Sequence, residues 1–147
     1  MRIRIIILAM LVASSLIAFA RKEETLAELI ARAESSKLDD RPHLYMEIAR
    51  WQVKTADQLY SEGKPEEGRA AVSDVVQYSD KASDAATQSG KKLKDTEIAV
   101  RKIVARLRDI RRTLAFEYQA PVQQAVDHLE QVRTELLSQM FGKKEHK

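Results

Sequence analysis

Apolar residues recur at intervals of three and four through almost the whole of residues 23–141. This spacing places one apolar stripe along each of a series of helices. Such a stripe is stable in water only when another element covers it. The chain also has few residues that end helices, with 4 glycines and 3 prolines among 147 residues. The sequence therefore predicts an all-α fold, an antiparallel bundle of four to five amphipathic helices.

The composition supports one small folded domain. Hydrophobic residues make up 44% of the chain and charged residues 32%, which is too apolar for an intrinsically disordered protein. The chain contains no cysteine, so disulfide bonds and a lipid-modified cysteine are excluded. Packing alone must hold the bundle together.

The first twenty residues have the three parts of a secretory signal peptide. Two arginines within the first four residues precede a mostly apolar run of 13 residues, 5–17. A membrane-spanning helix needs roughly 20 apolar residues. The small side chains of Ala18 and Ala20 suit a signal peptidase, so we expect cleavage between Ala20 and Arg21. The mature protein is then exported, to the periplasm or beyond the cell.

An uncleaved anchor is the alternative for this segment. Residues 3–20 are long enough to cross a thin bilayer, and the positive charges of Arg21 and Lys22 disfavour processing. Both alternatives place the rest of the chain outside the cytoplasm. If the signal peptide is removed, contact with the membrane is transient.

The remaining chain divides into a helical domain, residues 21–141, and a solvated tail, residues 142–147. Two glycines and a proline mark its turns: the sequence Gly63-Lys64-Pro65 ends one helix and starts the next, and Gly90 ends the second of these. The predicted helices span approximately residues 23–36, 42–62, 65–89, 92–119 and 121–141.

Residues 51–82 resemble a single tetratricopeptide hairpin, with the turn at residues 63–65 in the matching place. Repeats of that family stabilise one another by stacking. One such hairpin therefore predicts a helix pair and not the binding groove of the family.

Pro121 should interrupt the C-terminal helical pattern, because proline lacks an amide donor and clashes with the preceding turn. We expect a kink or break near Gln119. Before it, larger apolar residues at alternating spacings of three and four resemble a coiled-coil seam. The seam consists of Leu93, Val100, Ile103, Val104, Leu107, Ile110 and Leu114.

The length of this C-terminal region leaves two arrangements open. Residues 92–141 as one helix would extend about 75 Å, whereas residues 23–36 would cover only about 20 Å. Either the chain folds back at Pro121 into a compact bundle, which is the arrangement we expect, or a second copy covers the 93–114 seam in a homodimer.

The charge balance argues against a nucleic-acid partner. The formal net charge of +3 includes two arginines of the predicted signal peptide, and residues 21–147 hold 23 basic and 22 acidic residues. A phosphate-binding surface needs a larger positive excess. No aromatic residue lies among the basic residues before Phe116, as a site for single-stranded nucleic acid would require.

One segment is nevertheless strongly basic, since residues 91–112 hold nine basic and three acidic residues. Its simplest interpretation is a solvated face that offsets acidic helices, with Glu97–Arg101 and Asp109–Arg112 paired within the helix. The functional interpretation is a surface for anionic lipid, an envelope polymer or an acidic partner. The candidate residues are Lys91, Lys92, Lys94, Arg101, Lys102, Arg108 and Arg112.

No pattern in the sequence predicts a catalytic residue, a metal site or a cofactor. His43 and Glu47 lie one helical turn apart, but a metal site needs a third ligand. His128 lacks the glutamate three residues earlier that di-iron bundles use. The sequence thus favours a non-enzymatic binding or structural module of the cell envelope with a protein partner. The alternative is a membrane-tethered envelope protein whose helix 91–112 contacts anionic lipid or an acidic partner.

Overall fold

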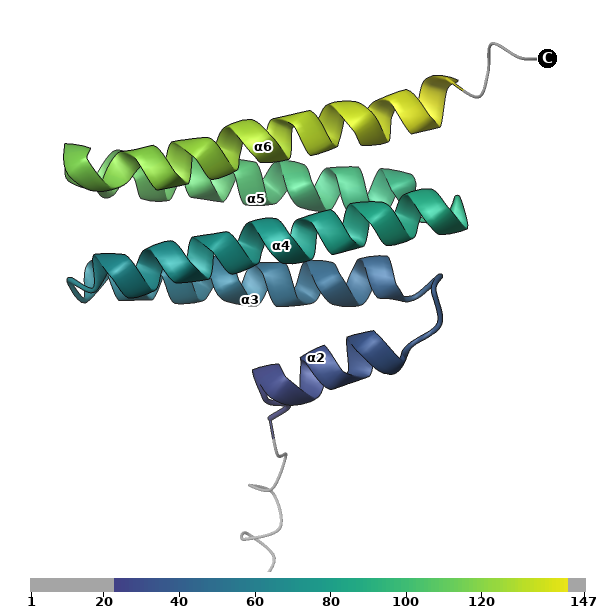
Figure 1. Ribbon diagram of the computed structural model, residues 1–147, viewed down its shortest axis with the longest axis horizontal. Helices are drawn as coiled ribbons and strands as arrows, with labels where there is room; N and C mark the ends of the chain where they lie inside the picture. Colours follow the sequence, from purple (N-terminus) through teal and green to yellow (C-terminus); the bar gives the residue numbers. More distant parts are fainter. Residues whose placement is uncertain (1–22, 143–147) are drawn as a thin grey trace, which may run out of the picture.

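The computed structural model describes residues 23–142, and this range contains five helices and no strand (Figure 1). The predicted signal peptide, with Ala18, Ala20 and Arg21, and residues 143–147 of the predicted tail lie outside the described residues. The all-α prediction is confirmed. The helices are α2 (Leu26–Ser35), α3 (Arg41–Ser61), α4 (Pro65–Ser89), α5 (Leu93–Thr113) and α6 (Phe116–Phe141).

The four long helices form the bundle, and the short α2 lies outside it along α3 (Figure 1). Helices α4 and α6 make the near face in Figure 1, and α3 and α5 make the far face. Besides the two sequential pairs, α3–α4 and α5–α6, contacts join α3 to α5 and α4 to α6. Helix α3 therefore has α2, α4 and α5 as neighbours, and nine of its residues are buried.

Both glycine turns have the predicted backbone. Gly63 and Gly90 have φ angles of 73° and 66°, which glycine adopts without steric cost. Pro65 then begins α4, where its missing amide hydrogen has no partner to lose. The predicted bounds of 65–89 agree with the structure.

The predicted break at Pro121 is wrong. Helix α5 ends at Thr113, and Pro121 lies inside α6. Proline at the sixth position of a helix removes one backbone hydrogen bond, to the carbonyl of Glu117 in the first turn. Glu117 is exposed in the first turn of α6, where water is able to bond its carbonyl in place of the missing amide.

The chain reverses instead at Leu114 and Ala115. Both residues are extended, with ψ angles of 147°. The Gln119 side chain donates to the Leu114 carbonyl at 2.9 Å, and the Tyr118 amide donates to the Ala115 carbonyl at 2.9 Å. These bonds satisfy backbone groups at the break without a glycine or proline. The local composition therefore gave no sign that the chain reverses at these two residues.

The apolar seam of α5 is covered by α6 of the same chain. Val100, Leu107 and Ile110 on α5 are at most 1% exposed, as are Leu129 and Leu136 on α6. The chain thus folds back as expected, although at a different residue. A homodimer through the 93–114 seam would have to displace α6.

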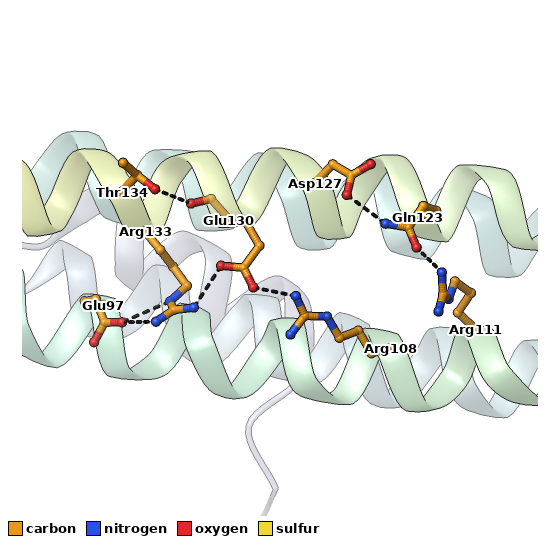
Figure 2. Close-up of polar contacts among 8 residues, drawn as sticks. All are labelled: Glu97, Arg108, Arg111, Gln123, Asp127, Glu130, Arg133 and Thr134. Carbon is orange, nitrogen blue, oxygen red and sulfur yellow. Dashed lines mark hydrogen bonds and ion pairs between the residues drawn. The ribbon is translucent and has the colours of Figure 1, made fainter.

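A ladder of ion pairs fixes α6 against α5 (Figure 2). Arg133 donates to Glu97 from Nε at 2.9 Å and from Nη2 at 2.8 Å, and it donates to Glu130 at 2.8 Å. Glu130 also accepts from Arg108 at 2.7 Å. The predicted Glu97–Arg101 pair is wrong, because Glu97 points toward α6 and its side chain is only 8% exposed.

Helix α2 begins with a capping box that the sequence analysis overlooked. The Thr25 hydroxyl accepts from the Glu28 amide at 3.2 Å, and the Glu28 carboxylate accepts from the Thr25 amide at 2.8 Å. This reciprocal pair satisfies two amides that have no helical partner. It explains why α2 begins at Leu26 and not at residue 23.

Candidate partner-binding surface

The two faces of the bundle carry opposite charge. Helices α3 and α5 together have ten basic and five acidic residues, whereas α4 and α6 have three basic and nine acidic residues. Because α3 lies beside α5 and α4 beside α6, these charges separate into two sides of the molecule (Figure 1). The candidate surface is on the α3–α5 side.

Four of the seven predicted surface residues are paired with carboxylates. Their nitrogen–oxygen distances are 2.6 Å for Lys91–Asp39, 3.9 Å for Lys92–Asp95, 2.7 Å for Arg108–Glu130 and 3.1 Å for Arg112–Asp109. The last pair is one that the sequence predicted. Hydrogen bonding to Asp39 raises the pKa of the Lys91 ammonium. For these four residues, the structure supports the simpler interpretation that their charges are offset within the molecule.

The other three, Lys94, Arg101 and Lys102, are exposed on α5 and form no hydrogen bond or ion pair with any residue of 23–142. Two basic residues of α3, Arg50 and Lys54, are in the same situation. We call these five residues the basic face. The sequence analysis missed Arg50 and Lys54 because α3 as a whole is nearly balanced in charge, although their spacing of four residues places them on one side of the helix.

Arg50 connects the basic face to two depressions. One is a hollow of about 120 Å³ between α3 and α5, where Arg50 lies near Lys92 and Thr96. The other is a groove of about 550 Å³ between α2 and α3, which we call the Trp51 groove. Its lining residues are Glu24, Leu29, Arg32, Glu47, Arg50, Trp51, Lys54, Thr55 and Gln58.

Trp51 is the main apolar side chain exposed in this groove, with 41% of its surface accessible. At helical spacing Trp51 continues the apolar stripe of Leu44 and Ile48, and these two residues are 7% and 0% exposed. Trp51 differs because it lies at the groove between α2 and α3, where the ten-residue α2 leaves the indole only partly covered. Trp51 thus belongs to the apolar stripe of α3, but α2 is too short to cover its whole indole ring.

The acidic residues of the Trp51 groove are already engaged. Arg32 contacts Glu24 at 2.9 Å and Glu47 at 3.5 Å, and Glu47 also contacts His43 at 3.3 Å. The Arg32–Glu47 contact therefore links α2 to α3 beside the groove. Arg50 and Lys54, further along α3, remain unpaired.

The histidines do not assemble a metal site within residues 23–142, where no group of three or more potential ligands has suitable geometry. His43 contacts Glu47, and His128 contacts Asp80 at 2.7 Å across α4 and α6. Each pair is an ordinary surface contact. Between residues 23 and 142 no helix is both long and apolar enough to cross a membrane.

Comparison with known proteins gives no relative from which a function is transferable. The chain matches no protein family, no curated protein and no solved structure.

Proposed function

We propose that this chain is an exported, non-enzymatic binding module of the cell envelope, and that its basic face binds an acidic protein partner. The observation that supports this proposal is the set of five exposed basic side chains without a carboxylate partner, on two adjacent helices. Most other basic residues of α3 and α5 are paired within the chain, so the positive charge left for a partner is concentrated at these five positions.

Electrostatic attraction of this kind favours a partner with matching negative charge and speeds its association. It also acts over about one Debye length, near 8 Å at physiological ionic strength. Lys94 and Lys102 are eight residues apart, about 12 Å along α5. The basic face is therefore large enough to contact a macromolecule at several points at once.

The location outside the cytoplasm rests on the first twenty residues. Their basic start, short apolar run and small residues before Arg21 form the pattern of a signal peptide. The intact mass of the exported protein tests this part directly. We expect a mass that corresponds to residues 21–147, and a mass that includes residues 1–20 would favour a retained anchor.

A second candidate is contact with anionic lipid, as expected for a tethered form of the protein. Phe116 at the start of α6 is 91% exposed, and Arg112 lies four residues earlier at the same turn. An exposed aromatic ring near arginine suits the interface of a bilayer. This end of the bundle is distinct from the basic face, so the two candidates are separable by mutation.

Affinity capture from an envelope extract tests the proposed function. The immobilised mature protein is compared with the triple variant Lys94→Gln/Arg101→Gln/Lys102→Gln. Its matched control, Gln77→Glu/Gln88→Glu/Gln124→Glu, makes the same change in net charge at exposed positions of α4 and α6.

We expect a protein that binds at low salt, is released at high salt and is retained by the control but not by the triple variant. Equal capture by both variants would contradict the proposal. If the mature protein floats with anionic vesicles and the Phe116→Ser variant does not, the lipid candidate is favoured instead.

A further inference from the structure

The Trp51 groove combines an exposed aromatic side chain with two basic side chains that have no carboxylate partner. Large exposed hydrophobic side chains within residues 23–142 are Leu38, Trp51, Phe116, Tyr118 and Phe141. Among them, Trp51 is the one that lines a groove between two packed helices. The indole is recessed, with the nearly buried Leu29 also lining the groove.

A half-exposed tryptophan in such a position is a typical anchor for a partner. Tryptophan and arginine dominate the binding energy of protein interfaces when they occupy a central depression. An aliphatic side chain placed on the indole would displace water from the remaining exposed surface of Trp51. The groove therefore supplies the apolar part of a binding site.

The charges beside Trp51 define the polar part. Arg50 and Lys54 are four residues apart, which separates them by about 6 Å along α3. A helix carries carboxylates at the same separation when its acidic residues are spaced by four. Among the basic residues that line the groove, Arg32 is paired with Glu24 and with Glu47, which precedes Arg50 by one turn on α3. Arg50 and Lys54 are therefore the groove's cations without a carboxylate partner.

We infer that the Trp51 groove binds an acidic amphipathic helix of a partner protein, which places an aliphatic side chain on Trp51 and two carboxylates against Arg50 and Lys54. This helix-in-groove mode uses one apolar and one charged side of the bound helix. The inference rests on the proposed function and assigns that function a specific site and partner chemistry.

A second copy of the chain fits this groove less well than a separate acidic helix. The acidic residues of α4 accompany small side chains such as Ala82 and Ala86, which are fully buried. Helix α4 thus presents carboxylates without an exposed aliphatic anchor. A flat bilayer surface fits less well, because Trp51 lines a groove between two helices.

Trp51 is the chain's one tryptophan, so its fluorescence reports on this site alone. The experiment titrates mature protein with an 18-residue helical peptide that contains leucines along one side and glutamates spaced by four along the other. Two matched peptides replace either the glutamates by glutamine or the leucines by serine.

We expect a saturable blue shift of Trp51 emission with the first peptide and at least tenfold weaker binding of each matched peptide. The variant Arg50→Ala/Lys54→Ala should weaken binding about tenfold, since it removes two partly exposed ion pairs. The control Gln77→Glu/Gln124→Glu makes the same change in net charge at exposed positions of α4 and α6 and should leave peptide affinity within about twofold at high salt, where long-range attraction is screened.

Several results would overturn the inference. These are no response to the acidic peptide, equal responses to the glutamate and glutamine peptides, or a shift caused by anionic phosphatidylglycerol vesicles alone. Concentration-dependent dimerisation in sedimentation that is abolished by Trp51→Phe would assign the groove to a second copy. If the acidic peptide does not bind the mature protein, but capture from the extract is still lost in Lys94→Gln/Arg101→Gln/Lys102→Gln, this site is refuted while the proposed function stands.

Discussion

The α5–α6 interface and the α2–α3 contact differ in how much apolar surface they bury. Between α5 and α6, large side chains such as Leu107 and Leu129 are completely buried, and the Glu97–Arg133 pair adds charge-assisted hydrogen bonds. From α2, only Leu29 and Ala33 are buried. Leu26 and Ile30 are only partly buried against the core, and the ion pairs of α2 lie at the surface, where each contributes about 0–1 kcal/mol.

This difference indicates which part of the molecule is rigid. Buried apolar contacts determine the free energy of local opening, and elements with few such contacts open first. The α5–α6 hairpin should therefore unfold only with the whole bundle, whereas α2 should detach locally. Because α2 forms one wall of the Trp51 groove, the proposed site has a fixed side and an adjustable side.

Removing a large side chain from the α5–α6 interface should have the largest effect. Leu129→Ala should lower the free energy of unfolding by about 3 kcal/mol, because it removes buried surface and leaves a cavity. Chemical denaturation followed by circular dichroism measures the change. A loss below 1 kcal/mol would show that this interface is not the rigid part. Leu137→Ala on the same helix, at a partly exposed position, serves as the control.

Removing the carboxylate of Glu97 should have the next largest effect. Glu97→Ala removes two of the three hydrogen bonds that Arg133 donates to carboxylates and should cost about 2 kcal/mol, with the remaining Glu130 contact and partial exposure limiting the loss. The double variant Glu97→Ala/Arg133→Met should recover much of that stability. If the double variant is no more stable than Glu97→Ala, the pair does not act as a unit.

The sequence predicted the turns that depend on local backbone preference more accurately than the features that depend on side-chain contacts. Gly63, Gly90 and Pro65 determine their turns through backbone preference alone, so local pattern was sufficient there. The break at Leu114 depends on side-chain hydrogen bonds that no local pattern reveals. Pro121 was misleading because its effect depends on its distance from the start of the helix.

The candidate surface was only partly predictable for the same reason. A count of basic residues located α5, but it did not show which side chains find carboxylates on other helices, as Lys91 does with Asp39. Arg50 and Trp51 became candidates only once the structure showed what α2 leaves uncovered. Both results depend on contacts between distant parts of the sequence.

Shortening Leu29 should affect α2 without unfolding the bundle. Leu29→Ala should cost about 1.5 kcal/mol of α2 docking, less than a core leucine, because α2 is able to detach. Hydrogen exchange of α2 amides should accelerate roughly tenfold while α5 amides remain unchanged. Equal acceleration in both helices would mean that α2 is part of the global folding unit.

Removing the N-terminal cap of α2 should have a smaller effect. Thr25→Ala eliminates the capping box and should destabilise α2 by about 1 kcal/mol. The same hydrogen-exchange measurement should show accelerated exchange in α2 alone. Thr25→Ser keeps the hydroxyl acceptor and is the matched control, so a similar loss in both variants would rule out the capping explanation.

The smallest effect should come from the pH dependence of α2 docking. Hydrogen bonding from Lys81 lowers the pKa of Glu34 below its usual value of 4.5. A lowered pKa stabilises docking above pH 4.5, and this contribution is lost as the pH falls through the folded-state value. Trp51 emission should therefore shift slightly toward that of an exposed indole below pH 4.5. The shift should be absent in Glu34→Gln, and its persistence there would assign it to another group.

The separation of charge between the α3–α5 and α4–α6 sides gives the bundle a large permanent electric dipole across its width. In the field of an anionic surface, a dipole experiences a torque before any contact forms. The molecule then arrives with Arg50 and Arg101 already facing the target. The arrangement of the helices thus orients the molecule during its approach. Added salt should therefore lower the association rate far more than it raises the dissociation rate.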